Sequence, residues 1–264
     1  MHDATATQTM SLTPEIEAAI EATAERTGTH RGHGALMPFA HRLLQSRHGA
    51  VLELSAAVQG ALAVEAFGFV RERPDPGPKL RHRRLNGDGN GTVVIEILND
   101  DMPFLVTSVI AAVQGRGLAA SHVLHPILVV ERDGAGRLVA LAESGSTATG
   151  AALSESLIVI LIDEAQEEAT IDGLIADLVA VLRDVKAAVG DWKPMLARLD
   201  AAIVALEAVP ASTARDLSSE TVAFCKWLRE GQFTFLGMRE YRLDGTPDTG
   251  ELVGVTGSGL GILA

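Results

Sequence analysis

The feature that most constrains the fold is a run of six consecutive apolar residues, Leu157 to Ile162 (LIVILI). Consecutive β-branched and aliphatic residues are typical of a strand. Because this run does not alternate with polar residues, both faces of the strand or its edge must be covered by other parts of the protein. Residues 92–98 (TVVIEIL) have a similar composition. We therefore expect strands at about 92–98 and 156–162.

The residues between these strands predict a helix and a β-hairpin. Pro103 can open a helix that ends near Arg116-Gly117. Strands are expected at about 120–131 and 137–142, joined by a turn at 133–136 (DGAG). These elements predict an antiparallel sheet with helices on one face, an α+β fold. The expected core comprises Val94, Ile97, Phe104, Val109, Ile127, Val129, Leu157, Val159 and Leu161.

The flanking regions are predicted to be mainly helical. Helices are expected at about 14–26, 36–47 and 51–72, then two helices within 165–207 separated near Gly190 and Pro194, and one helix from Pro210 to Gly231. Strands follow at about 233–243 and 251–255. We divide the chain into an N-terminal helical segment (1–85), an α+β domain (86–208) and the start of a following domain (209–264).

Residues 73–91 predict an extended, solvated connection. Three prolines precede a turn-rich run, and six basic side chains lie around them without interleaved aromatic residues. The basic residues are Arg71, Arg73, Lys79, Arg81, Arg83 and Arg84.

Composition excludes several classes of protein. At 264 residues with 47% hydrophobic residues the chain can bury a sizeable core, and the single Cys225 excludes a disulfide framework and fits the cytoplasm. The net charge of −12 disfavours nucleic acid as a partner. The most apolar helix, 51–70, carries Glu53 and Glu65, which argues against a membrane span.

One segment is a candidate binding site: Asn99, Asp100, Asp101, Met102, Pro103 and Phe104, between a strand and a helix. The simpler interpretation is a helix cap in which Asp101 is the capping residue and Pro103 lies in the first turn. Alternatively, exposed N–H groups at the helix start bind the carboxylate of a small ligand, while the aspartates attract its ammonium group. An amino acid carries both groups.

The remaining polar motifs predict no catalytic, cofactor or metal site. His122 and His125 are three residues apart on an expected strand and would point to opposite faces. His30 and His33 lie in a glycine loop without neighbouring cysteine or carboxylate ligands, and Cys225 is expected to be a packed thiol. The glycine run 257–261 predicts a flexible turn.

Three blocks of sequence resemble the N-terminal region of the large bacterial NAD-specific glutamate dehydrogenases. They are VVIEILNDDMPFLVTSV (93–109) with HPILVVERDGAGRL (125–138), ESLIVILID (155–163), and FCKWLREGQFTFLGMREYRL (224–243) with GSGLGIL (257–263). The resemblance covers about residues 51–264. It implies an ACT-like (ferredoxin-like) domain, a fold that binds amino-acid effectors and pairs subunits. Residues 101–105 are similar to the ACT loop Asp-x-Pro-Gly-x-Leu, with Phe104 in place of the glycine.

The resemblance implies that this chain is a regulatory and assembly region of a longer enzyme. That enzyme would convert L-glutamate and NAD to 2-oxoglutarate, ammonia and NADH, with its catalytic lysine and dinucleotide site far downstream. We expect this chain alone to be inactive and to bind no NAD. Its expected partners are a second copy of itself, an amino-acid effector and the rest of the dehydrogenase. The alternative is a free-standing ACT-like amino-acid sensor or oligomerisation module.

Overall fold

The computed structural model of this chain describes residues 12–28, 34–48, 54–85, 91–142, 152–163, 167–208, 215–246 and 248–264. The chain forms two compact units, Met1–Val181 and Leu182–Ala264. The boundary between them falls inside the long helix α5 (Glu168–Glu207). The division of the sequence at residues 85 and 208 stays a prediction.

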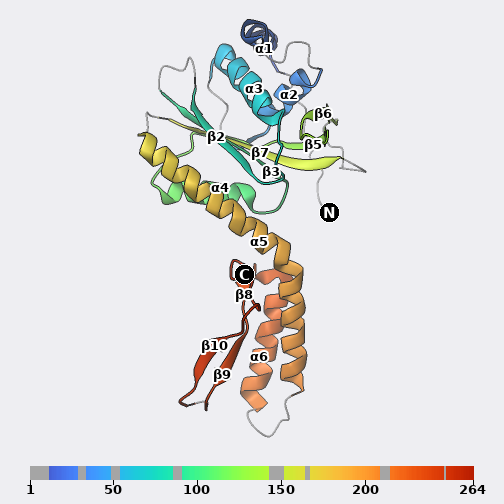
Figure 1. Ribbon diagram of the computed structural model, residues 1–264, viewed down its shortest axis with the longest axis vertical. Coiled ribbons are helices and arrows are strands. Elements are labelled where there is room, and N and C mark those ends of the chain that lie inside the picture. The colour runs from blue at the N-terminus through green and yellow to red at the C-terminus, as the bar shows by residue number, and fades with distance from the viewer. Residues whose placement is uncertain are drawn as a thin grey trace. The chain divides into compact units, whose positions relative to one another are not determined.

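The first unit is built on a seven-stranded sheet, drawn in Figure 1. Its strands follow the order β1-β4-β7-β3-β2, while β5 pairs with β7 and carries β6, and every pairing is antiparallel. The strands are β1 (Arg47–His48), β2 (Lys79–Arg84), β3 (Val93–Asp100), β4 (His122–Leu124), β5 (Ile127–Arg132), β6 (Leu138–Leu141) and β7 (Leu153–Ile162).

The two apolar runs pair with each other inside the sheet. Strands β3 and β7 are in register from Val93 opposite Ile162 to Asp100 opposite Glu155. All residues from 155 to 162 are buried, as are those from 93 to 99. The predicted antiparallel α+β fold is therefore confirmed, and the apolar runs are strands covered on both faces.

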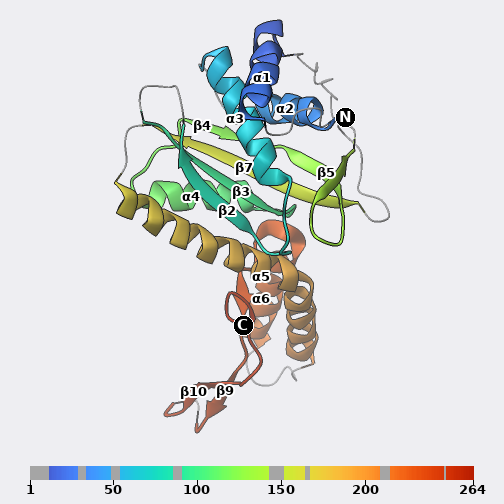
Figure 2. The same cartoon turned by 45° about the horizontal axis from the view of Figure 1, so that its top comes forward.

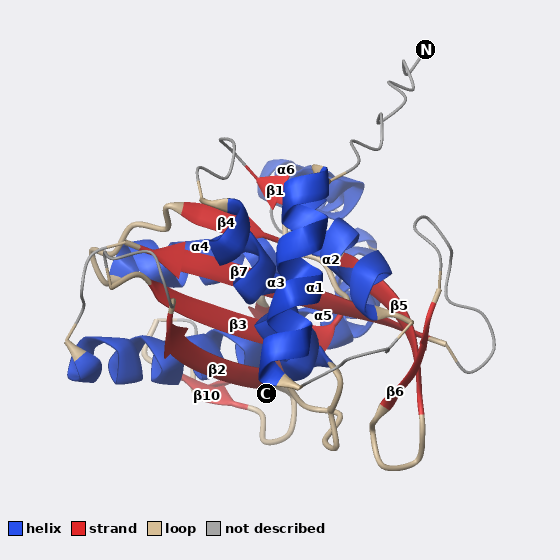
Figure 3. Ribbon diagram, turned by 90° about the horizontal axis from the view of Figure 1, so that it is seen from above, coloured by secondary structure: helices blue, strands red, loops and turns tan. Residues whose placement is uncertain are grey.

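Helices cover the two faces of this sheet (Figures 1 to 3). On one face lie α1 (Pro14–Thr27), α2 (Leu36–Gln45) and α3 (Ala56–Val70), the N-terminal helices. On the other lie α4 (Leu105–Gly115) and the first part of α5, whose buried Ile171, Leu174 and Leu178 face inward. The apolar side chains on the sheet face under α3 pack in one hydrophobic core with Phe39 and Phe67, which are two of the largest fully buried side chains.

Several local expectations were wrong. Residues 73–91 contain the strand β2, because its residues pair with β3 from Lys79 opposite Leu98 to Arg84 opposite Val93. The expected strand at 120–131 is divided into β4 and β5 around His125 and Pro126. The helix α5 is continuous through Pro194, where two helices were expected.

Seven of the nine expected core residues are buried, but Phe104 is 53% exposed and Ile127 is 52% exposed. Phe104 lies at the end of a loop, before the first turn of α4. Ile127 is the first residue of β5, and the next three residues of this strand are buried. An apolar residue at the end of an element therefore does not have to be buried.

The second unit contains the end of α5, the helix α6 (Arg215–Trp227) and a π-helical turn η1 (Leu228–Gln232). Two separate two-stranded sheets follow, in which β8 (Gly237–Met238) pairs with β11 (Leu260–Gly261) and β9 (Tyr241–Asp244) pairs with β10 (Glu251–Gly254). The glycine run forms the predicted turn, with Gly257 at φ 73°, but the buried Ser258 fixes it through a hydrogen bond to the Val255 carbonyl. None of the helices in the described part of the chain has the length and the apolar composition that a membrane-spanning segment requires.

Candidate functional site

The segment Asn99–Phe104 comprises the last two residues of β3, in the middle of the sheet, and the loop that leads from it to α4. Its backbone is held against the neighbouring strand, because the Asp101 N–H donates to the carbonyl of Ser154 at 2.9 Å. Asp101 itself is exposed and does not cap the helix, since the residue at the cap position is Phe104. The expected Asp101 cap is therefore wrong.

Phe104 has an unusual backbone conformation. It has φ 70° and ψ −3°, and among the described residues it is the one non-glycine residue with a positive φ. A side chain in this left-handed region costs about 1–2 kcal/mol because Cβ approaches the backbone. The loop thus keeps the conformation that a glycine would adopt while presenting an aromatic ring that is mostly exposed.

Asn99 and Ser156 form the buried polar end of the central strand pair. They lie opposite each other in β3 and β7, and both are almost fully buried. Ser156 Oγ is within hydrogen-bond distance of His125 Nε2, at 2.5 Å. The Asn99 amide nitrogen has no hydrogen-bond partner among the described residues, which leaves one buried donor directly before the loop.

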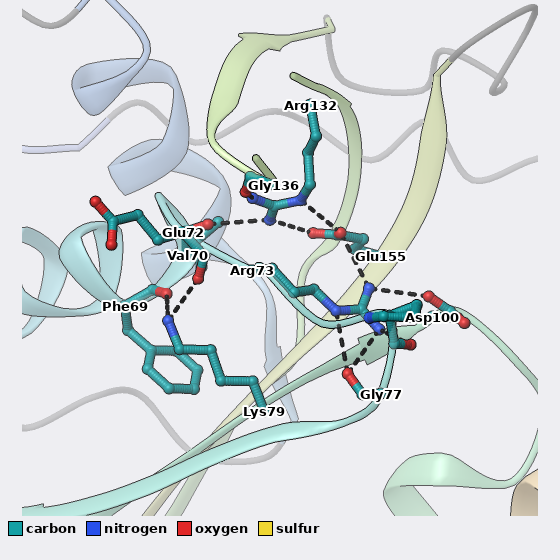
Figure 4. A network of polar contacts seen from close by, with 11 residues as sticks. Phe69, Val70, Glu72, Arg73, Gly77, Lys79, Asp100, Arg132, Gly136 and Glu155 are labelled. Atoms are coloured by element: carbon teal, nitrogen blue, oxygen red, sulfur yellow. Dashed lines mark hydrogen bonds and ion pairs between the residues drawn. The ribbon is translucent and has the colours of Figure 1, made fainter. Parts of the chain in front are cut away.

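Asp100 connects the loop to a buried ionic network, shown in Figure 4. Its carboxylate, 49% exposed, lies 2.9 Å from Nη1 of Arg73. The same Nη1 donates to Glu155 Oε1 at 3.0 Å, and the Glu155 side chain is fully buried. Arg132 holds Glu155 from the other side with two hydrogen bonds of 2.7 and 2.8 Å. The two arginines and two carboxylates balance in charge, as a buried ionic cluster requires.

This network also fixes the end of the helix α3 and the turns beside it. Arg132 Nη2 donates to the carbonyl of Val70, and Arg73 donates to the carbonyls of Pro76 and Gly77. Lys79 Nζ donates to the carbonyls of Phe69 and Glu72 at 2.7 and 2.6 Å (Figure 4). Cations at a helix C-terminus satisfy carbonyls that have no partner within the helix. Burial and the nearby Arg81 lower the pKa of Lys79.

A second buried carboxylate lies on the same face of the sheet. Glu96, in β3, is fully buried, and its Oε2 lies 2.5 Å from Nε of Arg81 and 3.2 Å from Nε of Arg83. Arg83 also forms an ion pair of 2.9 Å with Glu65 of α3. The basic stretch was expected to be a solvated linker, and this was wrong: Arg73, Arg81 and Arg83 neutralise carboxylates inside the protein.

Other candidates do not converge on this site. Within the part of the chain that the structure describes, His82, Glu168 and Asp172 bring ligand atoms within 4.8 Å of one another, on the protein surface. His82 Nε2 lies 3.8 Å from the carboxylate of Asp172, which is 67% exposed. His30 and His33 lie outside the described residues. His122 borders Ser121, away from the His125–Ser156 contact.

Sequence reasoning found Asp100 but missed Arg73, Arg132 and Glu155. Arg73 is 82 residues from Glu155 in the chain, and nothing local indicates their contact. One signal was available for the second carboxylate: Glu96 interrupts an apolar strand, and a buried carboxylate requires a cation. In addition, Arg81 and Arg83 alternate with Leu80 and His82, the period of a strand with one charged face.

Comparison with known proteins shows which family this chain resembles. Residues 40–178 match the family described as "Glutamate dehydrogenase, ACT1 domain". The chain is 33% identical over 232 residues to the NAD-specific glutamate dehydrogenase of Halomonas elongata, covering 86% of this chain and 14% of that protein. It is 29% identical over 185 residues to the enzyme of the same name from Pseudomonas aeruginosa, covering 70% of this chain and 11% of that protein.

Proposed function

Since this chain belongs to the NAD-specific glutamate dehydrogenase family and contains its ACT1 domain, we propose that it is the N-terminal regulatory and assembly region of such an enzyme. The whole enzyme would oxidise L-glutamate with NAD to 2-oxoglutarate and ammonia in the cytoplasm. The catalytic and NAD-binding parts would lie in polypeptide outside this region, because the chain spans only 14% and 11% of the two relatives.

The observation that carries this proposal is the position of Asp100. Its half-exposed carboxylate is on the last residue of β3, directly before the surface loop, and it lies 2.9 Å from the buried Arg73. Arg73 holds Glu155, and Arg132 joins Glu155 to the end of α3. A ligand or a subunit that draws Asp100 away from Arg73 would therefore alter the charge balance under α3. Such a contact couples the surface to the packing of the interior.

An amino acid has the chemistry to act at this loop. Its ammonium group would bind Asp100 and the exposed Asp101, and its carboxylate would accept hydrogen bonds from N–H groups at the start of α4. The buried amide nitrogen of Asn99 is one further donor beside the loop. These groups support an amino-acid effector as the regulatory ligand.

Phe104 supports a role in assembly. Its exposed ring is held by a backbone conformation that costs free energy in an isolated subunit. A second copy that covers this ring would offset part of that cost by burying apolar surface. We therefore propose that two copies associate through the surface around Phe104, and that an effector binding at this loop strengthens the association.

Sedimentation velocity over a range of concentrations, with and without a panel of amino acids, tests both roles. We expect self-association that an amino acid strengthens, and Asp100→Asn should remove the effect of the amino acid. Asp184→Asn is the matched control, because Asp184 is 48% exposed and also pairs with an arginine. A strict monomer at high micromolar concentration would refute the assembly role, and association insensitive to every amino acid would refute the effector.

Calorimetric titration with NAD tests the absence of a dinucleotide site. The 264-residue chain should release or absorb no binding heat, and it should not reduce NAD with glutamate. Micromolar affinity for NAD would contradict the proposed division between regulatory and catalytic regions.

A further inference from the structure

The hairpin of β9 and β10 in the second unit has one apolar face that the described residues of this unit leave exposed. The strands pair Leu243 with Leu252 and Tyr241 with Gly254, so Tyr241, Leu243 and Leu252 lie on the same face. The opposite face carries Arg242, Asp244, Glu251 and Val253. The alternation along both strands is that of a sheet with one buried and one solvated face.

The apolar face is nevertheless exposed in this chain. Tyr241 is 56% exposed, Leu243 is 43% exposed and Leu252 is 65% exposed. All eight residues of the two strands are exposed, so the described residues of the second unit bury neither face of the hairpin. Most of the large exposed apolar side chains among the described residues belong to this unit.

A hairpin of this kind needs a covering surface. An isolated two-stranded hairpin is marginally stable in water, and independent stability requires more strands or packing against another element. Both strands are also edges with unpaired backbone groups, which favours pairing with further polypeptide.

We propose that the face formed by Tyr241, Leu243 and Leu252 docks onto an apolar surface of the remaining dehydrogenase polypeptide. This inference rests on the proposed function, in which the chain is one region of a longer enzyme. The lengths of the relatives support this occupant, because most of each relative lies outside the matched region. The hairpin would then be the contact through which the regulatory region is joined to the part that follows it.

Hydrogen exchange tests the docking by comparing the same two strands in the short chain and in the full-length protein. The amides of β9 and β10 are measured in the 264-residue chain and in the natural full-length polypeptide that contains it. We expect exchange to slow at least about tenfold in the full-length protein, because docking removes local opening. The double variant Leu243→Ser/Leu252→Ser should lose this protection, whereas Val253→Ser, on the opposite face of the same strand, should keep it.

Because the replaced leucines are exposed in this chain, the variants should leave its circular dichroism and melting temperature unchanged. Equal exchange in the two contexts would overturn the proposal, as would a natural polypeptide that ends at Ala264. Protection in the short chain that rises with its concentration would identify a second copy as the occupant and would also overturn it. Glutamate oxidation by the unaltered full-length protein is assayed separately, so that loss of the proposed enzyme function is distinguished from loss of docking.

Discussion

Arg73 and Glu155 lie 3.0 Å apart in the interior of the first unit, and their side chains are 4% and 0% exposed. The contact joins the connection after α3 to the central strand β7. Arg73 also contacts Asp100 at the surface. The Arg73–Glu155 pair therefore connects the candidate loop to the core of the sheet. Its energetic importance can be measured directly.

Replacing Arg73 with methionine should destabilise the protein by about 3–5 kcal/mol, because it leaves a buried charge incompletely paired. Arg132 still contacts Glu155, so we expect the lower part of that range. Chemical denaturation measures the change in unfolding free energy. Arg183→Met is the control, since Arg183 is 76% exposed and should change stability by less than about 0.5 kcal/mol. Equal stability of both variants would show that the buried pair contributes little.

Phe104→Gly should stabilise the isolated subunit by about 1 kcal/mol, because glycine adopts a positive φ without the steric cost of a side chain. Phe104→Ala retains a Cβ and should show no such gain. Both variants remove the exposed ring, so both should weaken self-association if the ring lies at the interface. Thermal melts and sedimentation velocity separate the two effects. A large loss of stability in Phe104→Ala would indicate a buried ring.

The two central strands, β3 and β7, could be predicted from the sequence. Both of their faces are buried, so their residues are apolar in consecutive positions, and this pattern is easy to recognise. Prediction from the sequence fails at β2, where the charged residues Arg81 and Arg83 face inward and look like solvated residues. It also fails at Pro194, which usually ends a helix but is exposed within the continuous α5. At β2 the deciding contacts are the pairing with β3 and the ion pairs with Glu96, which local propensity does not record.

The candidate site divides in the same way. Residues adjacent in sequence, Asn99 to Phe104, could be selected because they lie together where the chain passes from the end of β3 to the start of α4. The partners that give Asp100 its role come from distant segments, and single-sequence reasoning has no measure of that proximity. The positive φ of Phe104 was likewise not predicted, because an aromatic residue rarely adopts it.

The turn between β5 and β6 should show a defined acid dependence. The Asp133 carboxylate accepts hydrogen bonds from the N–H groups of Arg137 and Ala135, which lower its pKa below the ordinary 3.8. A carboxylate with a lowered pKa in the folded state stabilises the fold above its unfolded pKa, and this contribution is lost as pH falls through the folded pKa. Titration by nuclear magnetic resonance should therefore give a midpoint below 3.8.

Asp133→Asn is the comparison for this titration, because it keeps an acceptor oxygen but cannot ionise. The free energy of unfolding of the unaltered protein, compared with that of Asp133→Asn, should decrease only when the pH falls below the ordinary aspartate pKa. A normal Asp133 midpoint would show that the two hydrogen bonds do not persist in solution.

Two helical glycines provide opposite tests of packing. An added Cβ at Gly60, in α3, would lie 2.8 Å from the backbone carbon of Ala19 in α1, whereas an added Cβ at Gly190, in α5, would meet nothing within 4 Å. Gly190→Ala should therefore stabilise its helix by about 0.5–1 kcal/mol through reduced backbone entropy. Gly60→Ala gains the same helix propensity but must separate two packed helices, which costs about 1–3 kcal/mol. Denaturation of the two variants should give changes of opposite sign, and stabilisation by Gly60→Ala would contradict the close contact of α1 and α3.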